Sequence, residues 1–138
     1  MKMITKIALI LSLALVVLSS CTNKKDEIRR ELNDGIRASY ATKYEIAIEH
    51  YNNVLDIDPQ NTEAYLNLGR VFFNKKKYEK AMEYYNKTIE IDSSYGEAYK
   101  SRAQLNTLLG DRDAACQDYL KAEKYGVPNL YNFTKFCK

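Results

Sequence analysis

Apolar side chains recur at three- and four-residue spacing along much of the chain, and this spacing is typical of amphipathic helices. One such stripe consists of Ile46, Ala47, Tyr51, Val54 and Leu55. The next stripe along the chain consists of Ala81, Met82, Tyr85, Thr88 and Ile89. No alternating apolar and polar run bounded by turn residues indicates a strand. The pattern therefore predicts an all-α protein.

Residues between the stripes predict where helices end and begin. Pro59 prevents the preceding helix from continuing, and Asn61 is a predicted N-cap for the next one. Gly110 followed by Asp111 predicts a helix end and a helix start. We expect seven helices, arranged as three antiparallel pairs and a short final helix.

Two further helix starts are predicted near the C-terminus. Ser94 and Glu97 have the spacing of a capping box. Pro128 suits the first turn of a final helix over residues 128–138. Because about ten residues do not stay helical alone, this helix must pack on the third pair. It would do so through Leu130, Phe133 and Cys137.

The chain repeats itself from residue 28 onward. Residues 28–61, 62–95 and 96–129 align without gaps, and "KYEIAIEHYNNVLDIDP" lies in register with "KYEKAMEYYNKTIEIDS". The third segment, "DRDAACQDYLKAEKYGV", keeps the alanine and the tyrosine. A period of this length is typical of an array of helix pairs that stack to form a continuous core.

The repeated unit resembles the tetratricopeptide repeat, most closely over residues 62–95. The large and small residues of that family's pattern are matched there by Tyr65, Leu68, Gly69, Phe72, Ala81, Tyr85 and Thr88, with Ser93 where the pattern has proline. Charged or polar residues depart from the pattern at Glu31, Asp34, Arg102 and Asn106. The resemblance implies a superhelix of three helix pairs closed by a C-terminal capping helix.

In that family the first helix of each pair lines a concave groove that holds a protein or peptide. The matching positions imply an apolar strip formed by Leu32, Ile36, Leu66 and Phe73. Its rim is formed by Arg29, Arg70 and Lys100, and Gln104 occupies a further groove position. The strip suits a partly acidic peptide or helix with apolar side chains. Alternatively, some of these side chains close the groove against the tether or the terminal helix.

One docking mode of the family is not expected here. Its repeats that bind a chaperone's C-terminal carboxylate use lysine, asparagine and arginine at five positions. The residues at those positions are Leu32, Ile36, Asn67, Glu97 and Ser101. Only Asn67 agrees with the pattern, and Glu97 would repel a carboxylate.

The first 20 residues have the layout of an export signal. Lys2 and Lys6 precede an apolar stretch over residues 7–18, and Ser19 and Ser20 end it. A stretch of about 12 apolar residues is shorter than the roughly 20 that span a bilayer as a helix. Residues 1–20 are therefore predicted to be a signal peptide.

The sequence Leu18-Ser19-Ser20-Cys21 resembles the bacterial lipobox. The resemblance implies cleavage before Cys21, a lipid on its thiol and acylation of its new amino group, hence a lipoprotein anchored in the cell envelope, in the outer membrane. Residues 21–27 would be the lipidated tether, and Lys25-Asp26-Glu27 resembles a surface-export tag. Three alternatives are a secreted protein, an uncleaved anchor and a tether without a surface address.

Two cysteines, Cys116 and Cys137, remain once Cys21 is assigned to lipid. Outside the cytoplasm such a pair favours a disulfide, which would join the capping helix to the third repeat. The alternatives are two buried thiols and a redox-active dithiol. The Cys-x-x-Cys proximity of a catalytic dithiol is not present.

Charge and motifs exclude other functions. Without Lys2 and Lys6, 19 basic residues stand against 18 acidic ones, so the chain lacks the basic face that nucleic-acid binding needs. His50, aligned with Tyr84 and Asp118, is expected to face solvent. We find no phosphate loop or nucleophile motif and expect no catalysis, metal, cofactor or small-molecule substrate. The sequence favours a membrane-tethered adaptor, with a structural envelope subunit and a thiol-redox protein as alternatives.

Overall fold

The computed structural model describes residues 23–135 and residue 137. The predictions for the signal peptide, the cleavage site and the lipid on Cys21 lie outside these residues. Within them every regular element is a helix. The helices are residues 23–40, α2 (Tyr44–Ile57), α3 (Thr62–Asn74), α4 (Tyr78–Ile91), α5 (Gly96–Leu109), α6 (Arg112–Lys124) and α7 (Tyr131–Thr134).

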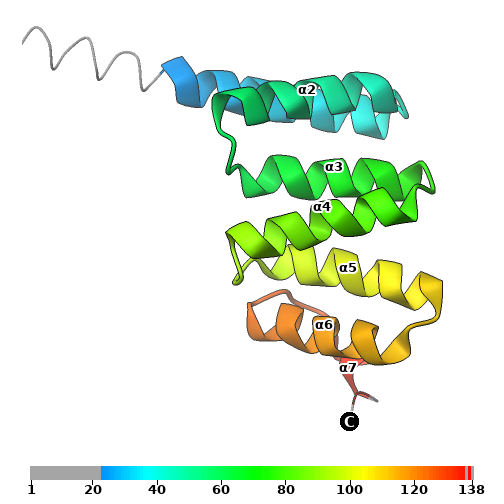
Figure 1. Cartoon of the computed structure of the whole chain (residues 1–138). Helices are drawn as coiled ribbons and strands as arrows, with labels where there is room; N and C mark the ends of the chain where they lie inside the picture. The colour runs from blue at the N-terminus through cyan, green and yellow to red at the C-terminus, as the bar shows by residue number, and fades with distance from the viewer. Residues whose placement is uncertain (1–22, 136, 138) are drawn as a thin grey trace, which may run out of the picture.

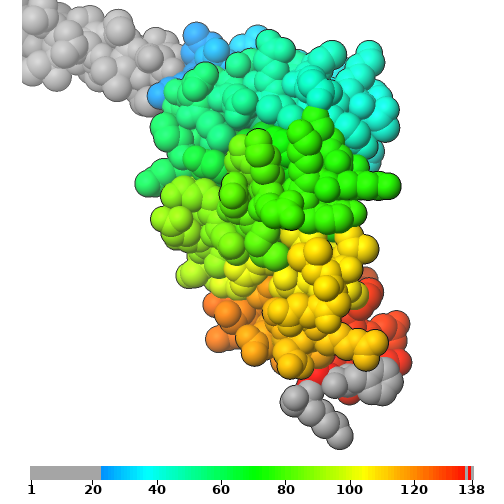
Figure 2. All heavy atoms as spheres, turned by 45° about the vertical axis from the view of Figure 1, so that its right-hand side comes forward, coloured from blue at the N-terminus to red at the C-terminus, as the bar shows by residue number. Residues whose placement is uncertain are grey.

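The helices stack as antiparallel pairs in the order of the chain (Figure 1). Contacts join each helix from α2 to α6 to its successor, and α7 packs on α6. The first pair and the last pair lie at opposite ends of the molecule in the space-filling view (Figure 2). This arrangement confirms the predicted all-α superhelix of three pairs and a terminal helix.

Capping groups explain why the helices begin where they do. The side chain of Asn61 accepts a hydrogen bond from the backbone N–H of Ala64 at 3.0 Å, and Asp111 accepts one from Ala114 at the same distance. Both predicted N-caps are therefore confirmed. The capping box is wrong, because Tyr95 is the N-cap residue of α5 and has no side-chain cap.

The turn inside each pair uses one backbone conformation three times. Thr42, Lys76 and Gly110 occupy the same repeat position and have φ of 58°, 58° and 86°. A left-handed residue after the helix end lets backbone N–H groups satisfy the last carbonyls. Glycine adopts this conformation without steric cost, so the third turn alone has the residue that the geometry favours.

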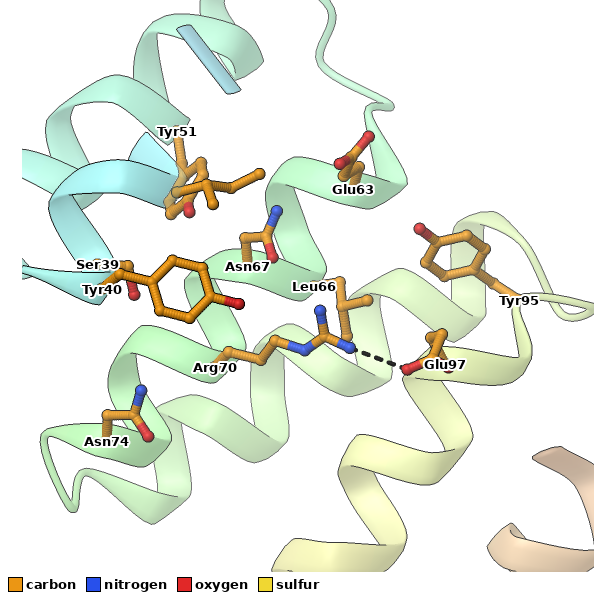
Figure 3. A pocket seen from close by; sticks show the side chains of 11 residues that line it. Ser39, Tyr40, Tyr51, Glu63, Leu66, Asn67, Arg70, Asn74, Tyr95 and Glu97 are labelled. Atoms are coloured by element: carbon orange, nitrogen blue, oxygen red, sulfur yellow. Dashed lines mark hydrogen bonds and ion pairs between the residues drawn. The ribbon is translucent and has the colours of Figure 1, made fainter. Parts of the chain in front are cut away.

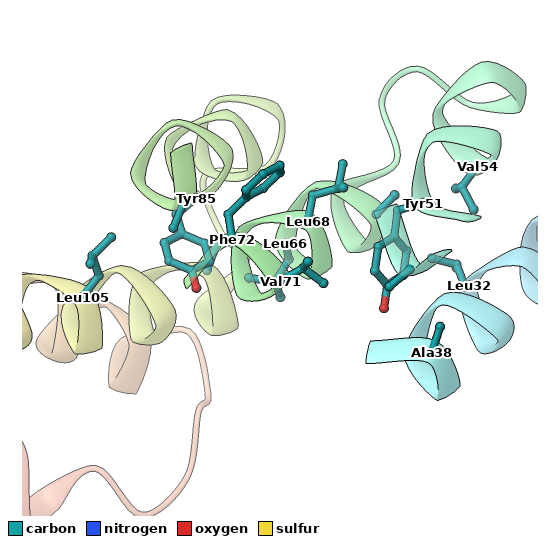
Figure 4. Packing of buried hydrophobic residues seen from close by; sticks show 14 residues of the cluster. Leu32, Ala38, Tyr51, Val54, Leu66, Leu68, Val71, Phe72, Tyr85 and Leu105 are labelled. Carbon is teal, nitrogen blue, oxygen red and sulfur yellow. The ribbon is translucent and has the colours of Figure 1, made fainter. Parts of the chain in front are cut away.

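In each of the first two pairs, a tyrosine ring of one helix packs on a glycine of the other helix. A Cβ atom on Gly35 would lie 2.6 Å from the ring of Tyr51, and one on Gly69 would lie 2.5 Å from the ring of Tyr85. Both rings are almost fully buried, at 1% and 2% exposure. They flank the buried side chains of α3, including Leu68 (Figure 4). The glycines therefore let the paired helices approach closely.

Two bounds differ from the predicted ones. Residues 23–27, assigned to a tether, are helical. This stretch contains no glycine or proline, and Asp26 accepts a hydrogen bond from Arg29 at 2.6 Å on the same helix face. The terminal helix is shorter than residues 128–138, because Asn129 has a left-handed φ of 62° and helix α7 begins only at Tyr131.

Candidate functional site

A hollow of about 370 Å³ lies on the side of the array formed by the first helix of each pair. Its walls come from helix 23–40, α3 and the start of α5, with one tyrosine from α2 (Figure 3). The lining residues are Ile36, Ser39, Tyr40, Tyr51, Glu63, Leu66, Asn67, Arg70, Asn74, Tyr95 and Glu97. Apolar, amide, hydroxyl and charged groups thus meet in one concave surface.

Three of the eight predicted groove residues line this hollow, namely Ile36, Leu66 and Arg70. Leu66 does so from the core, because its side chain is only 2% exposed, and Leu32 belongs to the same core cluster but does not line the hollow. Phe73 is half-buried against the core, with its ring centroid 5.9 Å from that of Tyr78. Leu32 and Phe73 therefore lie outside the lining of the hollow and pack against the core.

The other three predicted residues lie outside the hollow. Arg29 pairs with Asp26, and Gln104 is exposed. The Nζ atom of Lys100 lies 3.5 Å from a carboxylate oxygen of Glu97. These side chains do not form the basic rim that was predicted.

The one arginine that lines the hollow is already paired. A nitrogen of the Arg70 guanidinium lies 3.0 Å from the Glu97 carboxylate, and both side chains are more than a third exposed. Exposed pairs of this kind contribute at most about 1 kcal/mol of stability, so a partner can displace the pair at small cost. Arg70 nevertheless presents no uncompensated positive charge, because Glu97 is its partner.

Three tyrosines are among the lining residues that were not predicted from the sequence. Tyr40 is 87% exposed, whereas the Tyr51 ring is buried and burial raises its pKa to about 12. Burial also raises the pKa of Tyr95, and the negative charge of Glu63 adds to this effect. Tyr40 lies four residues after the predicted groove residue Ile36 on the same helix, so its place on the helix was a usable signal. Tyr51 was assigned to the core alone.

His50 was predicted to face solvent, but its side chain lies mostly buried against the neighbouring helix. Its Nδ1 atom lies 2.9 Å from a carboxylate oxygen of Glu31 on the neighbouring helix, and both side chains are about three-quarters buried. The hydrogen bonds from His50 and Asn53 lower the pKa of Glu31. The aligned residues Tyr84 and Asp118 are half-buried and buried, so this repeat position faces the paired helix throughout.

The departures from the repeat pattern in the third pair form a second polar contact. The guanidinium of Arg102 donates two hydrogen bonds to the Asp118 carboxylate, each 2.8 Å long, and a third to Asn86 at 2.6 Å. Asn106 donates to Asp118 at 3.4 Å. No buried side-chain nitrogen or oxygen of the described residues lacks a partner. This network therefore belongs to the core and not to a ligand site.

Cys116 on α6 and Cys137 lie in disulfide geometry, with their Cα atoms 5.4 Å apart. They border a shallow depression beside α7, where the Phe133 ring stacks on Tyr119 with centroids 4.8 Å apart. The side chain of Leu130, just before α7, is only 3% exposed. The geometry is compatible with a covalent link between α6 and the terminal segment.

Metal-ligand clusters and membrane-spanning helices are the other features to consider in the described part of the chain. No group of three or more His, Cys, Asp or Glu side chains is arranged to hold a metal ion there. Over the same residues no helix has the length and apolar character needed to cross a membrane.

Comparisons with known proteins agree on the repeat. The tetratricopeptide-repeat family model matches residues 62–95, and a second model, described as a TPR repeat, matches residues 43–76. No curated protein matches the sequence.

Solved structures of tetratricopeptide-repeat domains share the fold. The first TPR domain of human RPAP3 has a TM-score of 0.72 and 24% identity, covering 78% of this chain and 87% of that one. The second TPR domain of RPAP3, bound to an HSP90 peptide, has a TM-score of 0.68 and 28% identity, covering 78% of this chain and 98% of that one. The Arabidopsis OM64 TPR domain has a TM-score of 0.71 and 18% identity, covering 81% of this chain and 94% of that one.

Proposed function

Because the chain belongs to the tetratricopeptide-repeat family, we propose that it is a non-catalytic adaptor that binds a protein or peptide partner in its concave hollow. We further propose that a lipid on Cys21 anchors it in the bacterial cell envelope, in the outer membrane. The hollow of about 370 Å³ carries the first part of the proposal. The lipobox resemblance at residues 18–21 supports the second.

The lining of the hollow suits a polypeptide. Amide groups of Asn67 and Asn74 can pair with a peptide backbone, while Ile36, whose side chain is half-buried, offers apolar contact. RPAP3's second TPR domain is bound to the HSP90 peptide SRMEEVD. The lining of the hollow offers no free cation to such an acidic C-terminus, since its one arginine is paired with Glu97.

Photocrosslinking tests the partner-binding part of the proposal. A photoreactive phenylalanine analogue in place of Tyr40 should capture a partner in living cells, because this side chain is 87% exposed on the hollow. The same analogue in place of Tyr131, which is 70% exposed on α7, is the matched control. Capture of the same protein from both positions, or from neither, would contradict binding in the hollow.

Metabolic labelling with an alkyne fatty acid tests the anchor. The wild-type chain should incorporate the label and fractionate with membranes, and Cys21→Ser should lose both properties, because the thiol accepts the lipid. Cys116→Ser is the control and should keep the label. Equal labelling of Cys21→Ser and the wild type would contradict the proposed anchor. Protease treatment of intact cells then separates a surface position from a periplasmic one.

A structural role for the pair Cys116 and Cys137 completes the proposal. We assign them a disulfide that fixes the terminal segment to α6, supported by their Cα separation of 5.4 Å. Under this assignment the bond contributes stability and not chemistry. The Cys116→Ser, Cys137→Ser double variant should therefore still capture the partner through the Tyr40 position.

A further inference from the structure

The charges that line the hollow do not cancel. Three charged residues line it, and Arg70 and Glu97 pair with each other at 3.0 Å. Lys100, outside the lining, adds a second contact to Glu97 at 3.5 Å. Glu63 forms no ion pair with any other residue that the structure describes. Glu63 is therefore the one charged lining residue of the hollow that has no ion-pair partner among the described residues, and its carboxylate is available to a cation of a partner.

Groups that accept hydrogen bonds surround this carboxylate. Glu63 stands at the rim of the hollow between Tyr51 and Tyr95, and the Asn67 amide lies below it (Figure 3). The negative charge of Glu63 contributes to the raised pKa of both tyrosines, and for Tyr95 it is the largest cause after burial. Carboxylate, amide and phenol oxygens all accept hydrogen bonds from an ammonium or a guanidinium.

Aromatic rings complete the surroundings of the carboxylate. The Tyr95 ring is half-buried next to Glu63, and the Tyr40 ring projects from the opposite rim with 87% of its surface exposed. An aromatic face attracts a cation, and the aliphatic stem of lysine or arginine packs well on such a ring. The hollow thus combines a counter-ion with two surfaces for the stem.

We propose that the hollow binds a lysine or arginine side chain of the partner, with Glu63 as its counter-ion and Tyr95 and Tyr40 as its aromatic walls. This inference rests on the proposed function, because it names the partner chemistry of the same hollow. It reverses the charge predicted for the partner from the sequence. An acidic segment would have to face Glu63 and would share the one lining arginine with Glu97.

Selection from a library of random linear peptides displayed on phage tests the inference. The full chain in detergent micelles is the target, and Tyr40→Ala serves as the counter-selection target so that peptides bound elsewhere are discarded. We expect lysine and arginine to be enriched in the retained peptides and aspartate and glutamate to be depleted. Enrichment of acidic peptides that depend on Tyr40 would overturn the inference and leave the proposed function standing.

Binding measurements on one selected peptide then assign the contact. Changing its basic residue to glutamine, or changing Glu63→Gln in the protein, should each weaken Kd about tenfold, as expected for loss of a charge-assisted hydrogen bond. The two changes together should weaken Kd no more than either alone, because they remove the same contact. The control Glu49→Gln, an exposed carboxylate outside the hollow, should leave Kd unchanged.

The outcomes separate the two proposals. Additive effects of the two changes, or an unchanged Kd for Glu63→Gln, would overturn the role of Glu63 while the hollow still binds peptide. Peptides that bind wild type and Tyr40→Ala equally, or no retained peptides at all, would count against both proposals.

Discussion

Asp118 accepts two hydrogen bonds from the guanidinium of Arg102, each 2.8 Å long, across the two helices of the third pair. The Asp118 side chain is only 5% exposed and that of Arg102 is 21% exposed. The preceding repeat has Leu68 and Tyr84 at these two positions. One helix pair therefore uses an ion pair where its neighbour uses apolar and aromatic contact.

Breaking this ion pair should destabilise the protein strongly. Asp118→Ala should lower the free energy of unfolding by about 3 kcal/mol, because the charge of Arg102 is left partly buried without its partner. Urea denaturation followed by circular dichroism measures the change. Asp113→Ala, an exposed acidic residue in the first turn of the same helix, should cost less than about 1 kcal/mol. Equal losses would show that the pair is not buried in solution.

Replacing the whole network by the residues of the second repeat should restore stability. The triple variant Arg102→Leu, Asn106→Phe, Asp118→Tyr removes both charges together, so no unpaired charge is left in the core. We expect its free energy of unfolding to lie within about 1.5 kcal/mol of the wild-type value. A loss as large as that of Asp118→Ala would contradict the equivalence of the two repeats.

Adding one methyl group at Gly69 should destabilise the second pair. The new Cβ atom would lie 2.5 Å from the Tyr85 ring, and a clash of this kind outweighs the roughly 1 kcal/mol that alanine gains over glycine in a helix. In a Tyr85→Leu background the same Gly69→Ala change should cost much less, because the ring is gone and only the Cβ atom of Tyr84, at 3.3 Å, stays close. Thermal unfolding of the four proteins measures this coupling. Equal effects in both backgrounds would contradict the close contact.

Removing the cross-link should lower stability without changing the fold. The Cys116→Ser, Cys137→Ser variant should lose about 3 kcal/mol, because a loop of 21 residues gains freedom in the unfolded chain. A dithiol reductant should lower the Tm of the wild type and leave that of the variant unchanged. Maleimide labelling of both thiols in the unreduced, denatured wild type would show that the pair is not oxidised.

Alkaline pH should unfold the protein through its buried tyrosines. Burial raises the pKa of Tyr51 and of Tyr85 from 10.0 to about 12. Above pH 10 the unfolded state releases the phenol protons that the folded state still holds. Stability is therefore fully present below pH 10 and falls as pH rises toward 12.

Ultraviolet absorbance of tyrosinate measures this behaviour. The exposed tyrosines should ionise first, and Tyr51 and Tyr85 should ionise together with unfolding. Tyr51→Phe, which cannot ionise, should lose stability less steeply over the same pH range. The variant Tyr40→Phe, altered at an exposed ring, is the control and should follow the wild-type curve.

The local sequence was sufficient to predict where the helices lie, but it predicted few of the residues that line the hollow. Asn61 and Asp111 were identified as caps because each bonds to a backbone N–H only three residues away. Leu32 and Phe73 were predicted to line the groove, but they lie outside the lining of the hollow, because the crossing of helices turns both side chains into packing contacts. The repeat pattern gives the helix face of a residue but not the depth of its side chain.

By itself, the sequence determined the period of the repeat, the all-α class and the positions of most helix ends, because these depend on spacing and on contacts within a few residues. Only the tertiary structure decided which charges meet. Glu31 and His50 are 19 residues apart, and Arg70 and Glu97 are 27 residues apart. Their pairing depends on how closely the helices cross, and it leaves Glu63 as the unpaired charge in the hollow.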